Sequence, residues 1–348
     1  MKPSQGYNLI KIFDYPFTYE TGNIKLKVGD YVLIPFGKSK ITGVVWNEFE
    51  GKNNKKFLIK KVISKLNIPS LNINIINFLN WFSKYNLIPK GMALKLLLLS
   101  SEAISDIDLK EFIKFEINTE KKFFFLTEEQ SNALKDLNNE IDKFRVHVLQ
   151  GTTGSGKTIV YFESIKKIID KGNQVLIMLP EIGLTGQFEE KFREFFGFSA
   201  AIWHSGISLK KKKIIWNGIA TGKIKVVIGA RSSLFLPFKN LGLIIVDEEH
   251  DQSFKQDEGI VYNGRDMAIS RAYFENIPIN LITAVPSVET YENIKKSKYK
   301  ISKLKKRYQN ASLPNYEIIN MNNVKLEKQS WLSNEIIQKV NYHLDKKN

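Results

Sequence analysis

A glycine-rich segment in the middle of the chain constrains its fold more than any other feature. It fits the pattern G-x-x-x-x-G-K-[ST] and consists of Gly151, Thr152, Thr153, Gly154, Ser155, Gly156, Lys157 and Thr158. It follows an apolar strand expected at Val146–Gln150 and opens a helix expected at Lys157–Asp170. In that context backbone N–H groups face phosphate oxygens, Lys157 reaches the terminal phosphates and the Thr158 hydroxyl binds Mg²⁺. The alternative is a glycine-rich turn without a ligand.

Strands and helices alternate from about residue 121 onward. Two expected strands, Ile224–Ala230 and Leu241–Asp247, are almost wholly apolar, as they should be when helices cover both faces of a sheet. Further strands are expected at Gln174–Pro180, Ala200–His204 and Asn280–Val285, the last of the sheet, and further helices at Gly183–Phe196, 208–221 and Arg265–Glu275. This alternation predicts an α/β fold with a doubly wound, mostly parallel sheet.

An acidic segment, Asp247-Glu248-Glu249-His250, ends one of the apolar strands. A carboxylate at the carboxyl end of a parallel strand would lie beside the phosphate loop. There Asp247 would hold Mg²⁺ and Glu248 would polarise an attacking water as general base. His250 would sense the terminal phosphate or link the site to neighbouring segments. The alternative is a solvated acidic turn.

The first hundred residues follow a different pattern. Residues 1–66 predict short β-strands, among them Lys25–Pro35 and Ile41–Trp46, and so a small barrel or sandwich. Between residues 70 and 100 the apolar positions change to helical spacing, as at Ile75, Phe78, Leu79 and Phe82. A charged connector without a strong period follows at residues 101–123.

The composition narrows the classes of partner and cofactor. A net charge of +16 suits a polyanion such as nucleic acid, although codon bias or solubility would also explain it. The chain has no cysteine, which excludes disulfides and Cys-ligated metal sites from these 348 residues. Its four histidines are scattered, which argues against a histidine metal site. We expect a cytoplasmic protein with no membrane partner, because the chain shows neither a signal-peptide core nor a membrane-length apolar stretch.

The two motifs and their surroundings resemble superfamily 2 helicases of the DExH type, and more closely the primosomal protein N′ (PriA) family of replication-restart DNA helicases. The resemblance implies that the α/β part is a RecA-like helicase lobe 1. The run Asp247–Asp266 is the most specific part of the match, because it joins the acidic segment to an aromatic-rich loop. The other matching segments are Phe13-Asp14-Tyr15, Pro35–Lys38, Leu126–Gln130, Leu179–Thr185, His204-Ser205 and Ile228–Ser233.

The resemblance assigns roles in nucleotide and DNA binding to individual residues. Gln130 would read the adenine of ATP. In the aromatic-rich loop, Phe254 and Tyr262 would stack on unpaired bases and Lys255 would contact a backbone phosphate. The alternative is that both rings pack beneath the loop.

Two further groups of residues would contact DNA. At strand ends, Arg231 and Thr185 would touch phosphates, the alternatives being a surface salt bridge or a cap. The pocket for a free 3′-terminal nucleotide would be formed by Phe13, Asp14, Gly37 and Lys60.

The resemblance also divides the chain. Residues 1–104 would form the β-rich, then helical, DNA 3′-end-binding domain, and residues 105–123 a connector in which the winged helix of the family is reduced or absent. Residues 124–295 would form helicase lobe 1. Residues 296–348 would be a linker and the start of a second lobe whose remainder, with an arginine finger and a zinc module, lies outside these 348 residues. The family normally has threonine where Val285 stands here.

These features predict the N-terminal portion of an ATP-dependent 3′–5′ DNA helicase of replication restart, which assembles the primosome at stalled forks. The implied cofactors are ATP and Mg²⁺; zinc is expected for the family, but this chain has no ligands for it. The implied partners are branched or single-stranded DNA with a free 3′ end, other primosome proteins and single-strand binding protein. Two alternatives remain open, a truncated remnant that binds forks and nucleotide or serves as a scaffold without unwinding, and an unrelated phosphate-loop ATPase. Because the second lobe would supply an arginine, we expect the chain alone to hydrolyse ATP poorly.

Overall fold

The computed structural model describes residues 6–9, 17–49, 59–98, 125–180, 186–307, 318–321, 326 and 331–346. The chain divides into two compact units, Met1–Tyr308 and Gln309–Asn348. The second unit contains helix α9 (Asn334–Asp345), which has no buried residue. The features below belong to the first unit.

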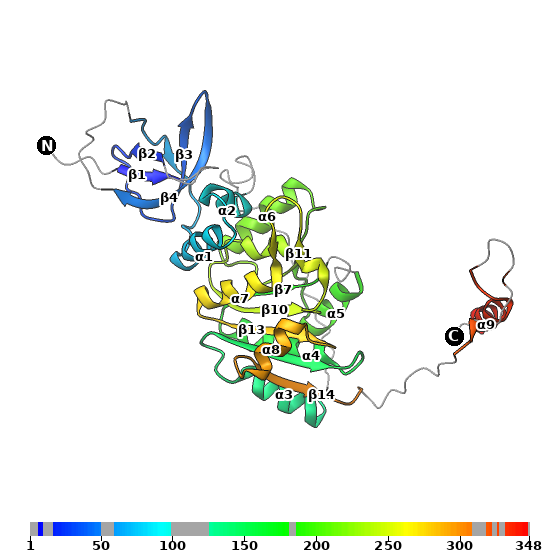
Figure 1. The fold of residues 1–348 in the computed structure, drawn as a ribbon. Coiled ribbons are helices and arrows are strands. Elements are labelled where there is room, and N and C mark those ends of the chain that lie inside the picture. Colours follow the sequence, from blue (N-terminus) through cyan, green and yellow to red (C-terminus); the bar gives the residue numbers. More distant parts are fainter. Residues whose placement is uncertain are drawn as a thin grey trace. The chain divides into compact units, whose positions relative to one another are not determined.

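A sheet of seven parallel strands forms the centre of the first unit (Figure 1). Its order is β14-β6-β13-β10-β7-β9-β8, which confirms the predicted doubly wound α/β fold. The strands are β6 (Arg145–Gly151), β7 (Gln174–Met178), β8 (Ala201–Trp203), β9 (Val226–Gly229), β10 (Leu241–Asp247), β13 (Pro278–Thr283) and β14 (Lys300–Leu304). The helices are α3 (Glu128–Asn138), α4 (Lys157–Asp170), α5 (Gly186–Phe196), α6 (Leu209–Ala220), α7 (Gly264–Glu275) and α8 (Val288–Lys295).

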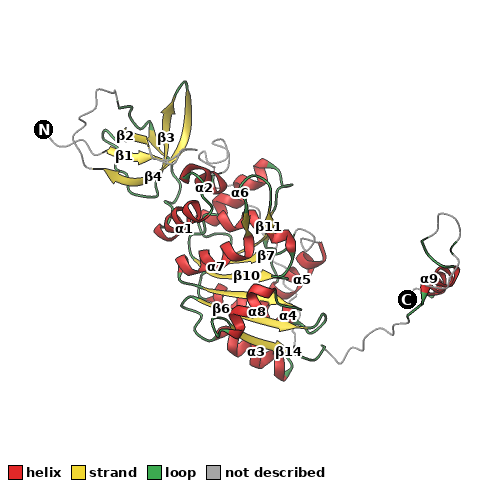
Figure 2. Cartoon of the chain, in the orientation of Figure 1, coloured by secondary structure: helices red, strands yellow, loops and turns green. Residues whose placement is uncertain are grey.

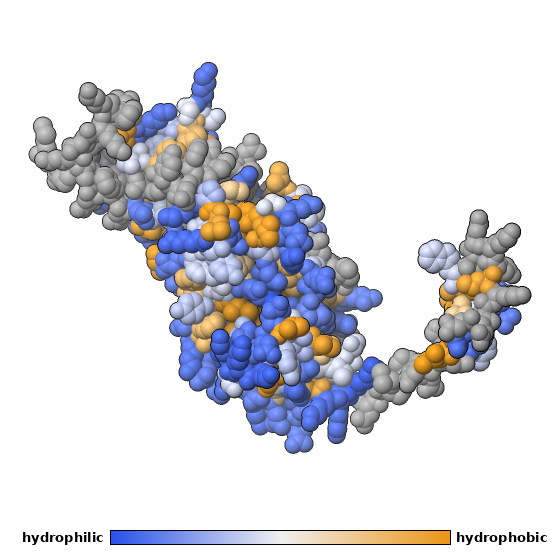
Figure 3. Space-filling model, viewed as in Figure 1, coloured by the Kyte–Doolittle hydropathy of each residue, from blue (hydrophilic) through white to orange (hydrophobic). Residues whose placement is uncertain are grey.

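Helices cover both faces of this sheet because successive strand residues point to opposite sides (Figure 2). In β10, Ile245 packs with residues of α3, α4 and α5, whereas its neighbour Ile244 packs with residues of α6 and α7. The same alternation separates Leu149 from Val148 in β6. Apolar side chains are therefore buried on both faces of the sheet. Much of the molecular surface seen in Figure 3 is hydrophilic.

The expectation that Asn280–Val285 is the last strand of the sheet was wrong. Strand β14 follows it in the chain and pairs with β6, with Lys300 opposite His147 and Leu304 opposite Gly151. Strand β14 buries Ser302 and Leu304 while Lys300 and Lys303 stay exposed, because successive residues of a strand point to opposite faces of the sheet. That short alternation was hidden in a lysine-rich segment.

The N-terminal part forms a five-stranded antiparallel sheet of order β2-β1-β4-β3-β5. The strands are β1 (Gly6–Leu9), β2 (Phe17–Glu20), β3 (Tyr31–Phe36), β4 (Ser39–Phe49) and β5 (Ser64–Lys65). Helices α1 (Ile73–Tyr85) and α2 (Lys90–Leu97) follow, and the four apolar residues predicted at helical spacing in α1 are all buried. The expected strand Lys25–Pro35 is wrong in its first half, because Gly29 has a φ of 90° and Asp30 organises a turn. The Asp30 carboxylate accepts hydrogen bonds from the Lys27 N–H, the Lys65 ammonium and the Ser70 hydroxyl.

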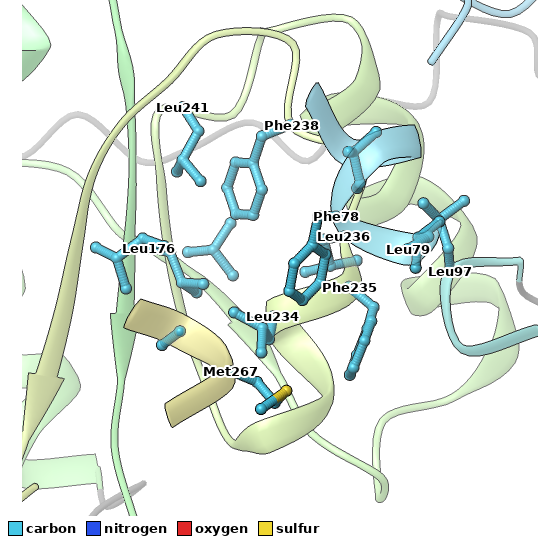
Figure 4. Packing of buried hydrophobic residues seen from close by; sticks show 14 of the residues in the cluster. Phe78, Leu79, Leu97, Leu176, Leu234, Phe235, Leu236, Phe238, Leu241 and Met267 are labelled. Atoms are coloured by element: carbon cyan, nitrogen blue, oxygen red, sulfur yellow. The ribbon is translucent and has the colours of Figure 1, made fainter. Parts of the chain in front are cut away.

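Side chains of the N-terminal part and of the parallel-sheet part share one core. Tyr31 packs edge-on against Trp216 at 5.5 Å, and the Trp216 indole N–H donates to the Leu97 carbonyl at 3.0 Å. Phe78 of α1 lies beside Phe235, among the apolar side chains drawn in Figure 4. The antiparallel sheet is therefore tied to the larger sheet through α1 and α2.

Candidate functional site

The glycine-rich loop joins β6 to α4, as its pattern predicts. Gly154 and Gly156 have φ values of 82° and 80°, which residues with a Cβ atom rarely adopt. Helix α4 begins without a side-chain cap, so the N–H groups of its first turn are available to an anion. The ammonium group of Lys157 is turned back onto the loop, donating to the carbonyl of Gly151 at 2.7 Å.

Asp247, at the end of β10, lies on the same pocket as this loop. The pocket has a volume of about 490 Å³, and its lining includes Thr153–Thr158, Asp247 and Glu248. One oxygen of Asp247 accepts from the Tyr161 hydroxyl at 2.8 Å, and the other accepts from the Glu248 N–H at 3.0 Å. Burial raises the pKa of Asp247 to about 6, against the lowering effect of the hydrogen bond from Tyr161.

The residues at this pocket fit a nucleotide-bound Mg²⁺. The Thr158 hydroxyl and the Asp247 carboxylate are oxygen ligands of the kind that Mg²⁺ binds. Among the described residues, no group of three or more acidic or histidine side chains could hold a metal ion. A cation here would therefore need phosphate oxygens and water to complete its coordination.

Gln130 ties α3 to the phosphate loop. Its side chain forms a capping box with Thr127, accepting from the Thr127 N–H at 2.9 Å. Its amide nitrogen donates to the Ser155 carbonyl at 2.9 Å, and the residue is buried. The predicted contact with adenine stays a prediction, and in this structure both ends of the amide bind the chain itself.

Glu249 is a functional candidate that the sequence did not reveal. Its buried carboxylate accepts from the Ser287 N–H at 2.8 Å, the Thr290 hydroxyl at 2.9 Å and the Arg265 guanidinium at 3.1 Å. Ser287 and Thr290 belong to the segment after β13, and Arg265 follows the aromatic-rich loop. The acidic segment is thus bonded to both of these segments at once.

His250 makes a second link from the acidic segment to the end of β13. Its Nδ1 lies 2.8 Å from the Thr283 hydroxyl, which donates to the Val285 carbonyl at 2.8 Å. Glu248 lies beside it, with a carboxylate oxygen 3.6 Å from the same Nδ1. The Val285 side chain is 68% exposed, so the threonine hydroxyl expected at this position would lie at the surface.

The base-stacking roles expected for Phe254 and Tyr262 stay predictions, and both rings are buried in this structure. Phe254 is 1% exposed and Tyr262 is 5% exposed. Tyr262 packs edge-on against Phe82 of α1 and against Phe235, at 5.6 and 5.7 Å. Helix α1 thus packs against Tyr262 of this loop, which fits the alternative of rings packed beneath the loop.

Arg231 and Lys255, the two basic residues expected to contact DNA phosphates, are joined by a hydrogen bond at this loop. Arg231 donates to the Lys255 carbonyl at 2.6 Å, which fixes the start of the loop to the end of β9. The Lys255 side chain is exposed, 3.2 Å from the Asp257 carboxylate. Thr185 lies outside the described residues.

The expected 3′-end pocket stays a prediction, but two of its residues lie at one cavity of the N-terminal part. Gly37 and Lys60 line a cavity of about 310 Å³ together with the aromatic residues Phe17 and Phe36, whose rings meet edge-on at 5.5 Å. Phe13 and Asp14 lie outside the described residues. The sequence did not single out Phe17 or Phe36 as lining this cavity.

Comparison with known proteins supports the resemblance. Residues 7–98 match the 3′ DNA-binding domain (3′BD) of PriA, and residues 127–294 match the DEAD/DEAH box helicase family. Replication restart protein PriA of Rickettsia conorii is 43% identical over 325 residues, which are 93% of this chain and 49% of that protein. The chain therefore carries a PriA 3′ DNA-binding domain and a DEAD/DEAH box helicase domain.

More distant PriA proteins match a smaller part of the chain. PriA of Bacillus subtilis is 37% identical over 218 residues, 62% of this chain and 27% of that protein. The chain spans about half the length of the first curated PriA relatives that it matches. Among solved structures, the UvsW helicase from bacteriophage T4 covers 56% of this chain and 66% of its own, at 19% identity and a TM-score of 0.38. This last likeness is too weak to add to the argument.

The two domain matches contain the site described above. The 3′BD match includes Gly37 and Lys60, and the helicase match includes the phosphate loop and the acidic segment. No helix in the described part of the chain is long and apolar enough to cross a membrane.

Proposed function

We propose that this chain is the nucleotide-binding and DNA-end-binding portion of an ATP-dependent 3′–5′ DNA helicase that acts in replication restart. The observation that carries the proposal is the meeting of Lys157, Thr158 and Asp247 at one pocket, although they come from two separate segments. A 3′ DNA-binding domain that shares a core with this lobe supports DNA as the partner.

Each residue of the pocket has a proposed task. Lys157 leaves the Gly151 carbonyl to bind the terminal phosphates, and the uncapped start of α4 binds phosphate oxygens. Thr158 and Asp247 hold Mg²⁺, which would neutralise phosphate charge when bound. Glu248, half-exposed at the pocket, orients and deprotonates the attacking water. Gln130 keeps the loop in place and is the proposed adenine contact.

The proposed DNA ligand is a branched or single-stranded DNA with a free 3′ end. Lys60 and Gly37, with Phe13 and Asp14, would hold the terminal nucleotide, while Arg231, Lys255 and Thr185 would contact phosphates elsewhere on the strand. Primosome proteins and single-strand binding protein are proposed as further partners on the family resemblance alone. We also propose divisions of the chain at residues 104 and 123. The boundary expected at residue 295 is wrong, because β14 (Lys300–Leu304) belongs to the parallel sheet, so we propose that a second lobe starts after this strand.

Steady-state ATP hydrolysis by residues 1–348, with and without a fork bearing a free 3′ end, tests the catalytic part. We expect nucleotide binding with slow turnover, because an arginine from a second lobe accelerates related phosphoryl transfers by about three to five decades. Lys157→Ala is the control that should abolish nucleotide binding. Brisk DNA-stimulated turnover by these residues would overturn the need for a second lobe, and fork binding without nucleotide binding would favour a remnant without motor activity.

Fork binding tests the DNA-end part, with a 3′-hydroxyl end compared with a 3′-phosphate end. Lys60→Ala should weaken binding of the 3′-hydroxyl fork by roughly threefold to tenfold, the effect of losing about one phosphate contact. Lys61→Ala is the matched control, because this neighbouring lysine is also exposed but does not line the cavity. Equal effects of the two changes would argue against a pocket at Lys60.

A further inference from the structure

Tyr161 is a buried side chain on the helix that follows the phosphate loop. It lies three and four positions after Thr158 and Lys157, so the three residues share one side of α4. The ring is completely buried and packs edge-on against Phe162 at 5.2 Å. Nothing in the phosphate-loop pattern requires a tyrosine at this position.

The Tyr161 hydroxyl is bonded to the acidic segment. It donates to the Asp247 Oδ2 at 2.8 Å, across 86 positions of sequence. A phenol hydroxyl has a proton to donate, and an ionised carboxylate only accepts, so Tyr161 is the donor in this pair. The remaining Oδ1 accepts from the Glu248 N–H at 3.0 Å.

Two donors from different elements therefore fix the plane of one carboxylate. One belongs to the phosphate-loop helix and the other to the backbone after β10. Each carboxylate oxygen can accept two hydrogen bonds, so one further position on each oxygen is left for a cation or its water. If the Tyr161 hydroxyl were absent, the Asp247 side chain could rotate, and a buried oxygen would lose its partner.

We propose that Tyr161 is a positioning residue, which holds Asp247 in the orientation that binds the Mg²⁺ of a Mg²⁺–nucleotide complex. The inference rests on the proposed function of the pocket and adds a residue to it. Because Tyr161 and Lys157 lie on one helix, the group that binds phosphate and the carboxylate that binds the cation are set by the same rigid element.

The test is the binding of a fluorescent ATP analogue, titrated with Mg²⁺ and repeated in EDTA. Tyr161→Phe removes only the hydroxyl. We expect a rise of roughly tenfold in the Mg²⁺ concentration at which the fluorescence of the bound analogue reaches half of its maximal increase. This is the effect expected for the loss of one hydrogen bond to a charged group. Affinity in EDTA should stay within about twofold, because the phosphate loop itself is unchanged.

Tyr31→Phe is the matched control. Tyr31 is also completely buried, but its hydroxyl has no hydrogen-bond partner among the described residues, so this change should leave the Mg²⁺ midpoint unaltered. The Tyr161 hydroxyl is also hydrogen-bonded to the Thr158 side chain. In an Asp247→Asn background, adding Tyr161→Phe should therefore shift the midpoint by clearly less than it does in the unaltered chain, and the difference is the part that acts through the carboxylate.

Two results would overturn the inference while leaving the proposed function in place. One is an unchanged Mg²⁺ midpoint in Tyr161→Phe, and the other is an equal loss of affinity with Mg²⁺ and in EDTA, which would indicate general damage to the pocket. Absence of any Mg²⁺-dependent nucleotide binding by the unaltered chain would overturn both.

Discussion

The carboxylate of Glu249 lies 3.1 Å from the guanidinium of Arg265, and the two side chains are 0% and 6% exposed. This buried ion pair joins the acidic segment to the residue that follows the aromatic-rich loop. Arg265 also donates to the Asp266 carboxylate at 2.8 Å, so the guanidinium is held on two sides. The pair therefore holds the acidic segment and the start of α7 together.

Removal of Glu249 should therefore destabilise the lobe strongly. Glu249→Ala removes the fully buried carboxylate beside Arg265 and leaves Asp266, whose side chain is 47% exposed, as the nearest partner. Loss of one partner costs about 3–5 kcal/mol in comparable buried pairs. Urea unfolding followed by circular dichroism would measure the change in free energy of unfolding.

The matched control for this prediction is Lys171→Ala. It breaks an ion pair with Asp142 in which the side chains are 39% and 80% exposed. Exposed ion pairs contribute about 0–1 kcal/mol to stability, so the free energy of unfolding of this variant should be close to that of the unaltered chain. A Glu249 variant as stable as the Lys171 variant would contradict a structural role for the buried pair.

A second prediction concerns the pH dependence of stability and His147. Burial lowers the pKa of His147 from 6.5 to about 4, and the neighbouring Arg145 guanidinium adds to this lowering. Between these two values the unfolded chain binds more protons than the folded one, so stability falls as pH falls. The stabilising contribution is complete above pH 6.5 and is lost as pH drops toward 4.

His147→Gln provides the comparison for this effect. A glutamine amide can still accept from Arg145 and donate to the Ser302 hydroxyl, the two hydrogen-bonding groups that lie 2.9 Å from the imidazole. Between pH 7.5 and pH 5 the free energy of unfolding should fall by about 2 kcal/mol more in the unaltered chain than in the variant. Parallel pH profiles of the two proteins would show that His147 titrates normally.

Much of the fold could be predicted because its determinants are local. Strand β10 and helix α4 have the predicted bounds, since six apolar residues define the strand and a glycine turn starts the helix. Strand β14 was missed because it is short, buries only Ser302 and Leu304, and carries lysines at exposed positions.

The site was predictable in its motifs but not in its contacts. Lys157 and Asp247 were found from sequence because each lies in a recognisable segment. Tyr161 and Glu249 were not, because their hydrogen-bond partners lie far away in the sequence and only the folded sheet brings them together. The burial of Tyr262 depends on α1, which no local pattern relates to the aromatic-rich loop.

A third prediction concerns Val285. Because its side chain is largely exposed and Thr283 already joins His250 to the segment, Val285→Thr should change the free energy of unfolding by less than about 0.5 kcal/mol. Urea unfolding measures this, and Thr283→Val, which removes the bonded hydroxyl, is the comparison expected to be less stable. A marked stabilisation by Val285→Thr would mean that the hydroxyl gains a buried partner.

The last prediction separates packing from DNA contact within the aromatic-rich loop. Phe254→Ala empties a site in the core and should cost about 3–5 kcal/mol of stability. Lys255→Ala removes an exposed charge and should leave stability unchanged, while lowering single-stranded DNA affinity and reducing the slope of log K against log salt concentration by about one unit. Fluorescence anisotropy over a range of salt concentrations, together with thermal unfolding of both variants, measures the two effects. A Lys255 variant with unaltered DNA affinity and salt slope would remove this loop from the proposed DNA interface, whereas a stable Phe254 variant with weakened DNA binding would restore the stacking role that burial argues against.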